Sequence, residues 1–335
     1  MGMQSPCRPG MCPPSSPRGT DARPGGRRSG VALSGAATPA LMVVFKERKE
    51  TFAPCEREDM TMGVPLIVAA SVLGAALLVF LLLLFLTAPR RHPALTPYLS
   101  VRFAHRGLHG EGRAENTLSA FAAAIGAGFG IELDVRLSSD GVPVVFHDDT
   151  LARMTGDPRR VDAVSAAELA ALDLGYGEGV PTFRKVLEQI GGRVPLLVEI
   201  KEDPFRTEVT DAVLPLLRGY TGPYIVESFN PFTVRRARRG LPGVAVGLLA
   251  DHMTLYPAYR GFRYFLVQSF FFNFLARPAF VAYNHEHADH LPFRFMRGFW
   301  RVPAFAWTVR SREEENNTRP RFDSVIFEQY IPDRQ

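Results

Sequence analysis

Cysteine is scarce in this sequence and confined to one part of it. The three cysteines, Cys7, Cys12 and Cys55, all precede a long apolar segment, and no cysteine follows that segment. This distribution excludes a disulfide framework, a thiolate metal site and a cysteine nucleophile from the rest of the chain.

Blocks of lysine and recognition-helix signatures are also missing, so we predict no nucleic-acid partner. The formal net charge of +5 is a mild basic excess. Such an excess favours anionic partners, for example phosphoesters or lipid headgroups.

Residues 1–60 show no persistent hydrophobic period and are rich in Pro, Gly, Ser and Arg. That composition predicts disorder. An alternative is that the stretch is an extension foreign to the natural protein, because Met60 and Met62 stand directly before the apolar segment.

The apolar segment, residues 64–86, reads VPLIVAASVLGAALLVFLLLLFL and has no charged residue. A helix needs about 20 apolar residues to cross a bilayer, whereas the apolar region of a signal peptide has only about 7–15. The segment therefore predicts a single transmembrane helix and a membrane protein. A buried core helix is the alternative.

Residues 87–100 form a short basic linker after this helix. Arg90 and Arg91 place positive charge on its C-terminal side, and the positive-inside rule then predicts that the following domain is cytoplasmic. If residues 1–60 belong to the protein, their own basic residues oppose this orientation.

From residue 101 to 332, short apolar runs alternate with helical patterns. We predict strands at 101–105, 131–135, 196–200, 224–228, 244–249, 279–283, 302–307 and 324–327, with an extra strand at 142–146. We predict helices at 117–127, 166–172, 182–190, 207–217 and 231–239. Strands that alternate with helices pair in parallel, and about eight such units close a TIM (β/α)8 barrel. A doubly wound open sheet is the alternative.

Titratable residues stand at the carboxyl ends of four predicted strands, where barrel enzymes collect their active groups. Glu132 and Asp134 leave the same face of one strand, and Glu199 ends the next strand of the barrel. Buried carboxylates repel one another unless a cation lies between them. An oxygen-only set favours one divalent cation, Mg²⁺ or Ca²⁺. The alternative is a salt-bridge network with Arg106, Arg136 and Lys201.

His105 and His147 are the candidate acid–base pair, because imidazole titrates near neutral pH. Arg106 and Lys201 would neutralise phosphate oxygens.

Glu115 and Asn116, followed by Thr117, open the helix after the first strand. There a cap presents backbone donors to an anion. Glu115 would contact a substrate hydroxyl, or it would contact a residue that itself binds the substrate.

Five short motifs, taken in order, resemble those of glycerophosphodiester phosphodiesterases, in particular a membrane-anchored bacterial-type member. They are His105-Arg106-Gly107, Glu115-Asn116-Thr117, Glu132-Leu133-Asp134, His147-Asp148 and Glu199-Ile200-Lys201. Ala306-Trp307-Thr308-Val309 is similar to the penultimate strand of that family.

The resemblance, which covers about residues 103–332, implies a TIM barrel with one Mg²⁺ or Ca²⁺ held by Glu132, Asp134 and Glu199. It implies His105 and His147 as general acid and base, and Trp307 in the wall of the cleft. The products would be sn-glycerol 3-phosphate and an alcohol. A lysophospholipase D-type reaction on a lipid-derived phosphodiester is the nearest alternative, and a non-catalytic, membrane-tethered barrel that binds phosphoesters is another. No protein partner is predicted.

Two stretches, residues 261–275 and 291–301, interleave phenylalanine with arginine. This pairing suits a membrane interface, although the same aromatics could pack helices against the barrel. Phe270, Phe271 and Phe272 are consecutive, and one helix cannot direct all three at the core.

Overall fold

A computed structural model describes residues 60–203 and 206–333 of the chain. The stretch for which we predicted disorder, residues 1–60, lies outside the described residues except for Met60. Helix α1 (Met60–Thr87) comes first. Within it, Gly63–Thr87 is long and apolar enough to cross a membrane, and none of its most apolar window is buried by the rest of the protein.

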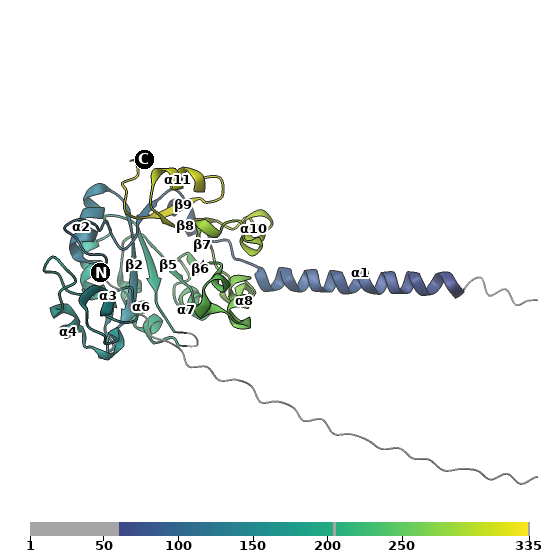
Figure 1. Ribbon diagram of the computed structural model, residues 1–335, viewed down its shortest axis with the longest axis horizontal. Helices are drawn as coiled ribbons and strands as arrows, with labels where there is room; N and C mark the ends of the chain where they lie inside the picture. The colour runs from purple at the N-terminus through teal and green to yellow at the C-terminus, as the bar shows by residue number, and fades with distance from the viewer. Residues whose placement is uncertain (1–59, 204–205, 334–335) are drawn as a thin grey trace, which may run out of the picture. The chain divides into compact units, whose positions relative to one another are not determined.

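Eight parallel strands close into a barrel after α1 (Figure 1). They are β1 (Arg102–Ala104), β2 (Gly130–Leu137), β4 (Leu196–Ile200), β5 (Tyr224–Ser228), β6 (Val246–Ala250), β7 (Val281–Asn284), β8 (Ala304–Val309) and β9 (Ser324–Phe327). Neighbours in the barrel follow chain order, and β1 pairs with both β2 and β9, which closes it. The extra strand β3 (Pro143–Val145) runs antiparallel to β2. The predicted TIM barrel is therefore confirmed, and the open sheet is wrong.

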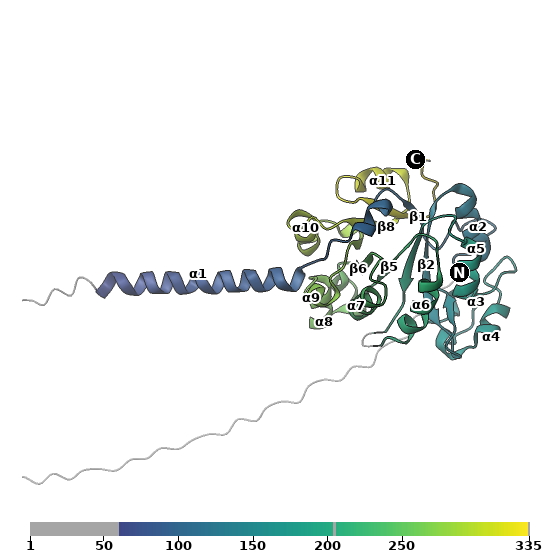
Figure 2. The same ribbon diagram turned by 180° about the vertical axis from the view of Figure 1, so that it is seen from behind.

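Helices connect the strands and cover the barrel from outside (Figures 1 and 2). They are α2 (Leu118–Ala127), α5 (Phe183–Ile190), α6 (Glu208–Gly219), α7 (Pro231–Gly240), α8 (Phe262–Gln268), α9 (Asn273–Ala276), α10 (Leu291–Gly298) and α11 (Arg312–Thr318). Between β3 and α5, an insertion contains α3 (Ala152–Thr155), the 3-10 turn η2 (Val161–Ala163) and α4 (Ala166–Ala171). Three further 3-10 turns follow β6 and β7: η3 (Met253–Leu255), η4 (Pro257–Tyr259) and η5 (His285–His287).

The interior of the barrel is filled by side chains that alternate along the strands, including Phe103, Leu197 and Phe305. The 3-10 turn η1 (Pro93–Tyr98), in the linker after α1, joins the same cluster through Leu95 and Tyr98. The Tyr98 hydroxyl donates to the carbonyl of Tyr224 at the start of β5, 3.1 Å away. The linker therefore closes the amino end of the barrel and leaves the carboxyl end open.

Two of the differences from the predicted elements have a clear local cause. The strand predicted at 302–307 begins only at Ala304 in β8, because Pro303 before it has no N–H to donate to the ladder. The segment around Phe270–Phe272 is a turn between α8 and α9. This break buries Phe270, which is 1% exposed, and leaves the next two phenylalanines partly exposed.

Candidate active site

A cavity of about 410 Å³ opens at the carboxyl end of the barrel, within the size range of small-molecule sites. Eight of the ten predicted site residues line it: His105, Arg106, Glu115, Glu132, His147, Glu199, Lys201 and Trp307. The other two, Asp134 and Asn116, are only 1% exposed. The structure thus brings residues of six separate segments to one place.

The turn after β1 depends on backbone conformations that few residues adopt. Arg106 has a φ of 55° and Gly107 a φ of 80°, in the left-handed region where glycine is not penalised. A Cβ atom on Gly107 would lie 2.9 Å from the Phe121 ring and 3.0 Å from Ala120 of helix α2. The turn directs the N–H of Arg106 to Glu132 Oε2, 2.8 Å away.

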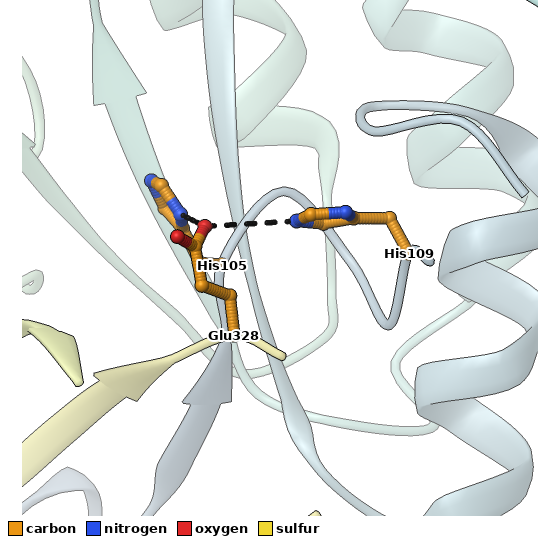
Figure 3. Close-up of side chains that lie close together, drawn as sticks. All are labelled: His105, His109 and Glu328. Atoms are coloured by element: carbon orange, nitrogen blue, oxygen red, sulfur yellow. Dashed lines mark hydrogen bonds and ion pairs between the residues drawn. The ribbon is translucent and has the colours of Figure 1, made fainter. Parts of the chain in front are cut away.

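The two predicted acid–base histidines are each held through the Nδ1 atom by a carboxylate. His105 Nδ1 lies 2.6 Å from Glu328 Oε2 (Figure 3), and His147 Nδ1 lies 2.6 Å from Asp148 Oδ1. A carboxylate accepts a hydrogen bond from Nδ1–H, which fixes the tautomer and leaves Nε2 for other chemistry. Burial lowers the pKa of both rings, although the carboxylates oppose this shift, and it brings the pKa of His147 to about 4.

Glu132, Asp134 and Glu199 form a buried acidic cluster. Asp134 on β2 stands directly opposite Glu199 on β4, and the three carboxylates bring oxygen atoms within 4.8 Å of one another. Their exposures are 2%, 1% and 6%. A divalent cation would fit these oxygens, which are the ligands that Mg²⁺ and Ca²⁺ prefer.

The crowding of these carboxylates shifts their pKa values. Burial, followed by repulsion from the other carboxylates, raises the pKa of Glu132 well above its usual range. Burial raises the pKa of Glu199 to about 7. Burial would also raise the pKa of Asp134, but the neighbouring cations, chiefly Lys201, hold it well below its usual value.

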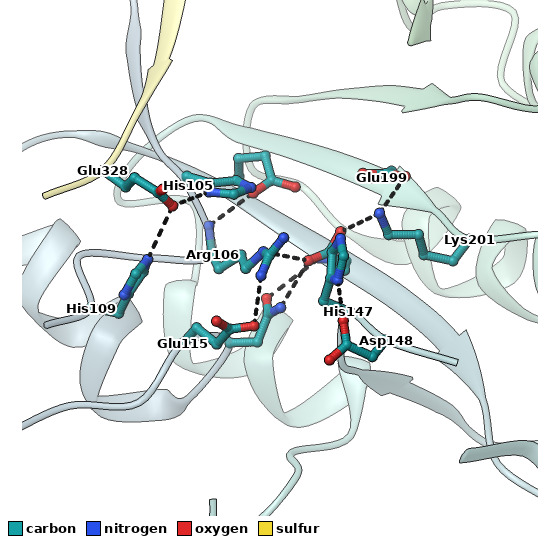
Figure 4. A network of polar contacts seen from close by, with 12 residues as sticks. His105, Arg106, His109, Glu115, His147, Asp148, Glu199, Lys201 and Glu328 are labelled. Atoms are coloured by element: carbon teal, nitrogen blue, oxygen red, sulfur yellow. Dashed lines mark hydrogen bonds and ion pairs between the residues drawn. The ribbon is translucent and has the colours of Figure 1, made fainter. Parts of the chain in front are cut away.

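Two cationic side chains reach the cluster (Figure 4). Lys201 Nζ lies 2.7 Å from Glu199 Oε1 and 3.0 Å from Asp134 Oδ1, and Arg106 Nε lies 3.5 Å from Asp134 Oδ2. Part of the expected salt-bridge network is therefore present. Arg136 is not part of it, because its guanidinium pairs with Asp149, 2.6 Å away.

The segment Glu115–Thr117 supports the cluster from the side. Glu115 lies between Arg106 and Arg153, at 2.8 Å and 2.6 Å. The side-chain amide of Asn116 donates to Asp134 Oδ2 at 2.9 Å, so it contacts a candidate metal ligand. Thr117, not Asn116, is the N-cap of α2.

Trp307, on β8, lies in the cavity wall. Its ring packs edge-on against Phe229, with 5.8 Å between the ring centres. The indole Nε1 is buried, and among the described residues it has no hydrogen-bond partner. This donor is available to a ligand.

Several site residues were absent from the sequence prediction: His109, Arg153, Glu227, Arg310 and Glu328. Glu328 directly follows β9 and contacts His105, His109 and Arg310. The strand-end rule that gave the other residues would have found it. Glu227 on β5 stands opposite Glu199; it is 1% exposed, and its Oε2 has no hydrogen-bond partner among the described residues.

His105, His109 and Glu328 also bring possible ligand atoms within 4.8 Å of one another. All three are partly exposed, and Glu328 already accepts a hydrogen bond from His105. This group therefore fits a role in histidine orientation, whereas the buried carboxylates offer the oxygen-only set that a divalent cation would fit.

Comparisons with known proteins identify the family of this chain. The chain is 29% identical over 238 residues to a glycerophosphodiester phosphodiesterase of Caldanaerobacter subterraneus subsp. tengcongensis, a match that covers 67% of this chain and 91% of that protein. The crystal structure of a glycerophosphodiester phosphodiesterase from Thermotoga maritima is 30% identical, with a TM-score of 0.53, over 68% of this chain and 94% of that one.

A second solved structure is an Oleispira antarctica phosphodiesterase in complex with the product sn-glycerol-3-phosphate. It is 26% identical, with a TM-score of 0.56, over 69% of this chain and 94% of that one. A family model described as the glycerophosphoryl diester phosphodiesterase family matches residues 105–319. The chain therefore belongs to the glycerophosphoryl diester phosphodiesterase family and is a phosphoric diester hydrolase.

Proposed function

We propose that this chain hydrolyses a glycerophosphodiester to sn-glycerol 3-phosphate and an alcohol, with the help of one divalent cation, Mg²⁺ or Ca²⁺. The observation that supports this most directly is one cavity that combines a buried three-carboxylate cluster with two carboxylate-oriented histidines. The product bound to the Oleispira antarctica neighbour supports the substrate class.

Glu132, Asp134 and Glu199 would hold the cation. Among the residues that the structure describes, four buried carboxyl groups at this end of the barrel, including Glu227, form ion pairs with only two basic side chains, Arg106 and Lys201. A divalent cation would relieve that excess of negative charge. When bound, it would supply positive charge beside the phosphate oxygens.

His105 and His147 would move the protons. One ring accepts a proton from the attacking water while the water oxygen bonds to phosphorus. The other ring gives a proton to the oxygen of the leaving alcohol as the P–O bond to it breaks. Because burial lowers both pKa values, a neutral imidazole is available as the base at neutral pH.

The remaining residues would bind and orient the substrate. Arg106 and Lys201 would contact phosphate oxygens, and Glu115 would accept a hydrogen bond from a glycerol hydroxyl. Asn116 would orient Asp134 through its amide. Trp307 would donate its free indole N–H to the substrate in the cavity wall.

Alcohol release from glycerophosphocholine, glycerophosphoethanolamine and lysophosphatidylcholine tests the proposal. We expect cleavage of the first two substrates, loss of activity with EDTA, and recovery with Mg²⁺ or Ca²⁺. Cleavage of lysophosphatidylcholine alone would favour the lysophospholipase D-type reaction, and binding without cleavage would favour a non-catalytic barrel.

Replacing either histidine tests the proton transfers. His105→Ala and His147→Ala should each lower turnover by about 10²–10⁴-fold, the usual contribution of a positioned acid or base. Circular dichroism should show that both variants fold. A folded variant with full activity would remove its histidine from the mechanism.

Helix α1 would act as a single-pass anchor, joined by residues 87–100 to a catalytic domain at 101–332. Arg90 and Arg91 follow the helix directly and support a cytoplasmic catalytic domain. Protease treatment of intact cells tests this orientation, since digestion of the barrel from outside would mean the opposite topology.

A further inference from the structure

The C-terminal end of α1 is fixed to the barrel. Thr87 is 3% exposed; its carbonyl accepts from the Asn273 side chain at 3.1 Å, and its hydroxyl oxygen accepts from the Trp300 indole at 3.0 Å. Three residues later, the N–H of Arg90 donates to the carbonyl of Pro278 at 3.0 Å. The end of α1 thus meets α9 and the segment that follows α10 (Figure 2).

Aromatic contacts extend this packing back along the helix. Phe85 lies against Phe274, with ring centres 5.7 Å apart, and Phe80 lies against Phe299, with ring centres 6.4 Å apart. Phe80 precedes Thr87 by seven residues, or about 10 Å of helix. Phe274 and Phe299 nevertheless remain 36% and 51% exposed, so α1 covers only part of each ring.

The length of α1 places these two rings at the edge of a bilayer. Its apolar span has 25 residues, which is about 37 Å of helix against a hydrocarbon core of about 30 Å. The final turns of α1 therefore reach the interfacial layer, and with them Phe274 and Phe299. Aromatic rings are favoured at that depth.

Five arginines surround the same end of α1: Arg90, Arg235, Arg238, Arg239 and Arg277. Arg238 Nε donates to the carbonyl of Ala276, next to Arg277, at 3.1 Å, and the N–H of Arg90 donates to the carbonyl of Pro278, on the other side of Arg277. Arg235 and Arg239 lie with Arg238 on helix α7. Burial lowers the pKa of Arg238, and the charges of the other four arginines lower it further. In the part of the chain that the structure describes, none of the five pairs with a carboxylate. By contrast, Arg236 on the same helix α7 pairs with Asp211 at 2.7 Å.

We propose that Phe274, Phe299 and these five arginines form one surface that docks on an anionic lipid bilayer. The arginines meet lipid phosphates, and the aromatic rings enter the interfacial layer. A lipid surface fits better than an acidic protein because the aromatic rings continue directly from a helix that is long enough to span the membrane. The side of the barrel formed by α7 and α9 then lies against the bilayer.

Photocrosslinking of the full-length chain tests this proposal. The chain is reconstituted into phosphatidylcholine nanodiscs that contain phosphatidylglycerol with a photoreactive headgroup, and crosslinked peptides are located by mass spectrometry. We expect crosslinks in residues 235–239 and at Arg277, in addition to crosslinks near the ends of α1.

The variant Arg235→Glu/Arg239→Glu/Arg277→Glu should lower the crosslinks in α7 and α9 by about tenfold, since its charges repel anionic lipid, and leave those at α1 unchanged. The matched control, Arg184→Glu/Lys185→Glu, reverses two exposed charges on α5 and should change neither set.

Crosslinks confined to α1 and its linker would overturn the proposal. A second result would also overturn it: nanodiscs that each contain two chains, with this surface shielded from solvent to the same extent with and without phosphatidylglycerol. That result would mean that the surface contacts a second copy of the chain. Hydrolysis of glycerophosphocholine by the triple variant in detergent would show that the variant is folded. The crosslinking result would then test membrane docking independently of the proposed activity.

Discussion

At the scale of single residues, the site is organised by carboxyl groups that act on other side chains. Glu328 accepts from His105 and also pairs with Arg310, 2.8 Å away. These neighbours hold its pKa far below the usual range, although burial opposes them. A permanently charged carboxylate at Nδ1 stabilises the imidazolium form of His105, which acid–base catalysis requires.

Glu328→Gln should therefore lower kcat by about 10–100-fold, the usual effect of losing a partner that orients a reactive group. KM should change much less, because Glu328 acts on His105. Glu328→Asp should recover part of the activity, and Glu313→Gln, an exposed change on α11, serves as the control. An unchanged kcat in Glu328→Gln would remove Glu328 from the catalytic arrangement.

Glu227 gives a prediction about stability and pH. Burial, followed by repulsion from Glu199, raises its pKa well above the unfolded value of 4.5. The folded protein then holds this proton more tightly than the unfolded chain does. Stability from this group is fully present below pH 4.5 and is lost as pH rises toward the folded pKa.

Glu227→Gln removes the titrating carboxyl group and therefore the loss of stability at higher pH. In EDTA, the midpoint of thermal unfolding of the variant should rise relative to that of the parent between about pH 5 and about pH 8. A difference between the two proteins that is constant over this range would contradict the raised pKa.

Most cavity residues were predictable because they follow a simple rule. His105 and Glu199 stand at or near the carboxyl ends of recognisable strands, and a closed parallel barrel brings those ends together. Arg153 could not be found in this way. Its contacts with Glu115 and Asp148 depend on how the insertion folds back over the barrel, and no local pattern in the sequence specifies that packing.

At the scale of elements, the insertion between β3 and α5 braces the rim. It has its own apolar cluster, which includes Leu151, Val161 and Leu169. Helix α3 of the insertion places Arg153 between Glu115 and the aspartate that holds His147. The insertion thereby contacts the supports of the site.

Arg153→Ala should lower kcat by about fivefold or less, because its side chain is 47% exposed and exposed ion pairs contribute only up to about 1 kcal/mol. Arg159→Ala, in the same insertion but paired with Asp157 and Glu168 away from the cavity, is the matched control and should leave kcat unchanged. Equal kcat values for the two variants would mean that the insertion does not support the site.

The predicted element boundaries were accurate where the hydrophobic pattern is strong. The strands predicted at 196–200, 224–228 and 324–327 have the observed limits, since each is a short apolar run with clear ends. The region from β6 to β7 was harder to predict. There the chain forms η3, η4, α8 and α9 in succession, and tertiary packing of many aromatic side chains decides where each short helix ends.

At the scale of the whole molecule, the chain closes one end of the barrel and keeps the other for chemistry. Leu95 and Tyr98 of η1 fill the amino end, so the linker after α1 is part of the fold. The open end contains the acidic cluster. In the absence of a cation, the repulsion among its carboxylates destabilises the folded state.

A cation that binds the acidic cluster should therefore stabilise the entire barrel. A ligand at about 100 times its Kd adds about 2.7 kcal/mol to the free energy of unfolding. For a domain of this size, each kcal/mol raises the midpoint of thermal unfolding by about 2–4 °C. Differential scanning fluorimetry of the full-length chain should thus show that the unfolding midpoint rises by about 5–10 °C when Mg²⁺ or Ca²⁺ replaces EDTA.

The variant Glu132→Gln/Glu199→Gln should lose this rise, because it removes two of the three proposed ligands. The control Glu188→Gln, an exposed change on α5, should keep it. If the parent protein unfolds at the same temperature in EDTA and in saturating cation, the buried carboxylates do not form a cation site.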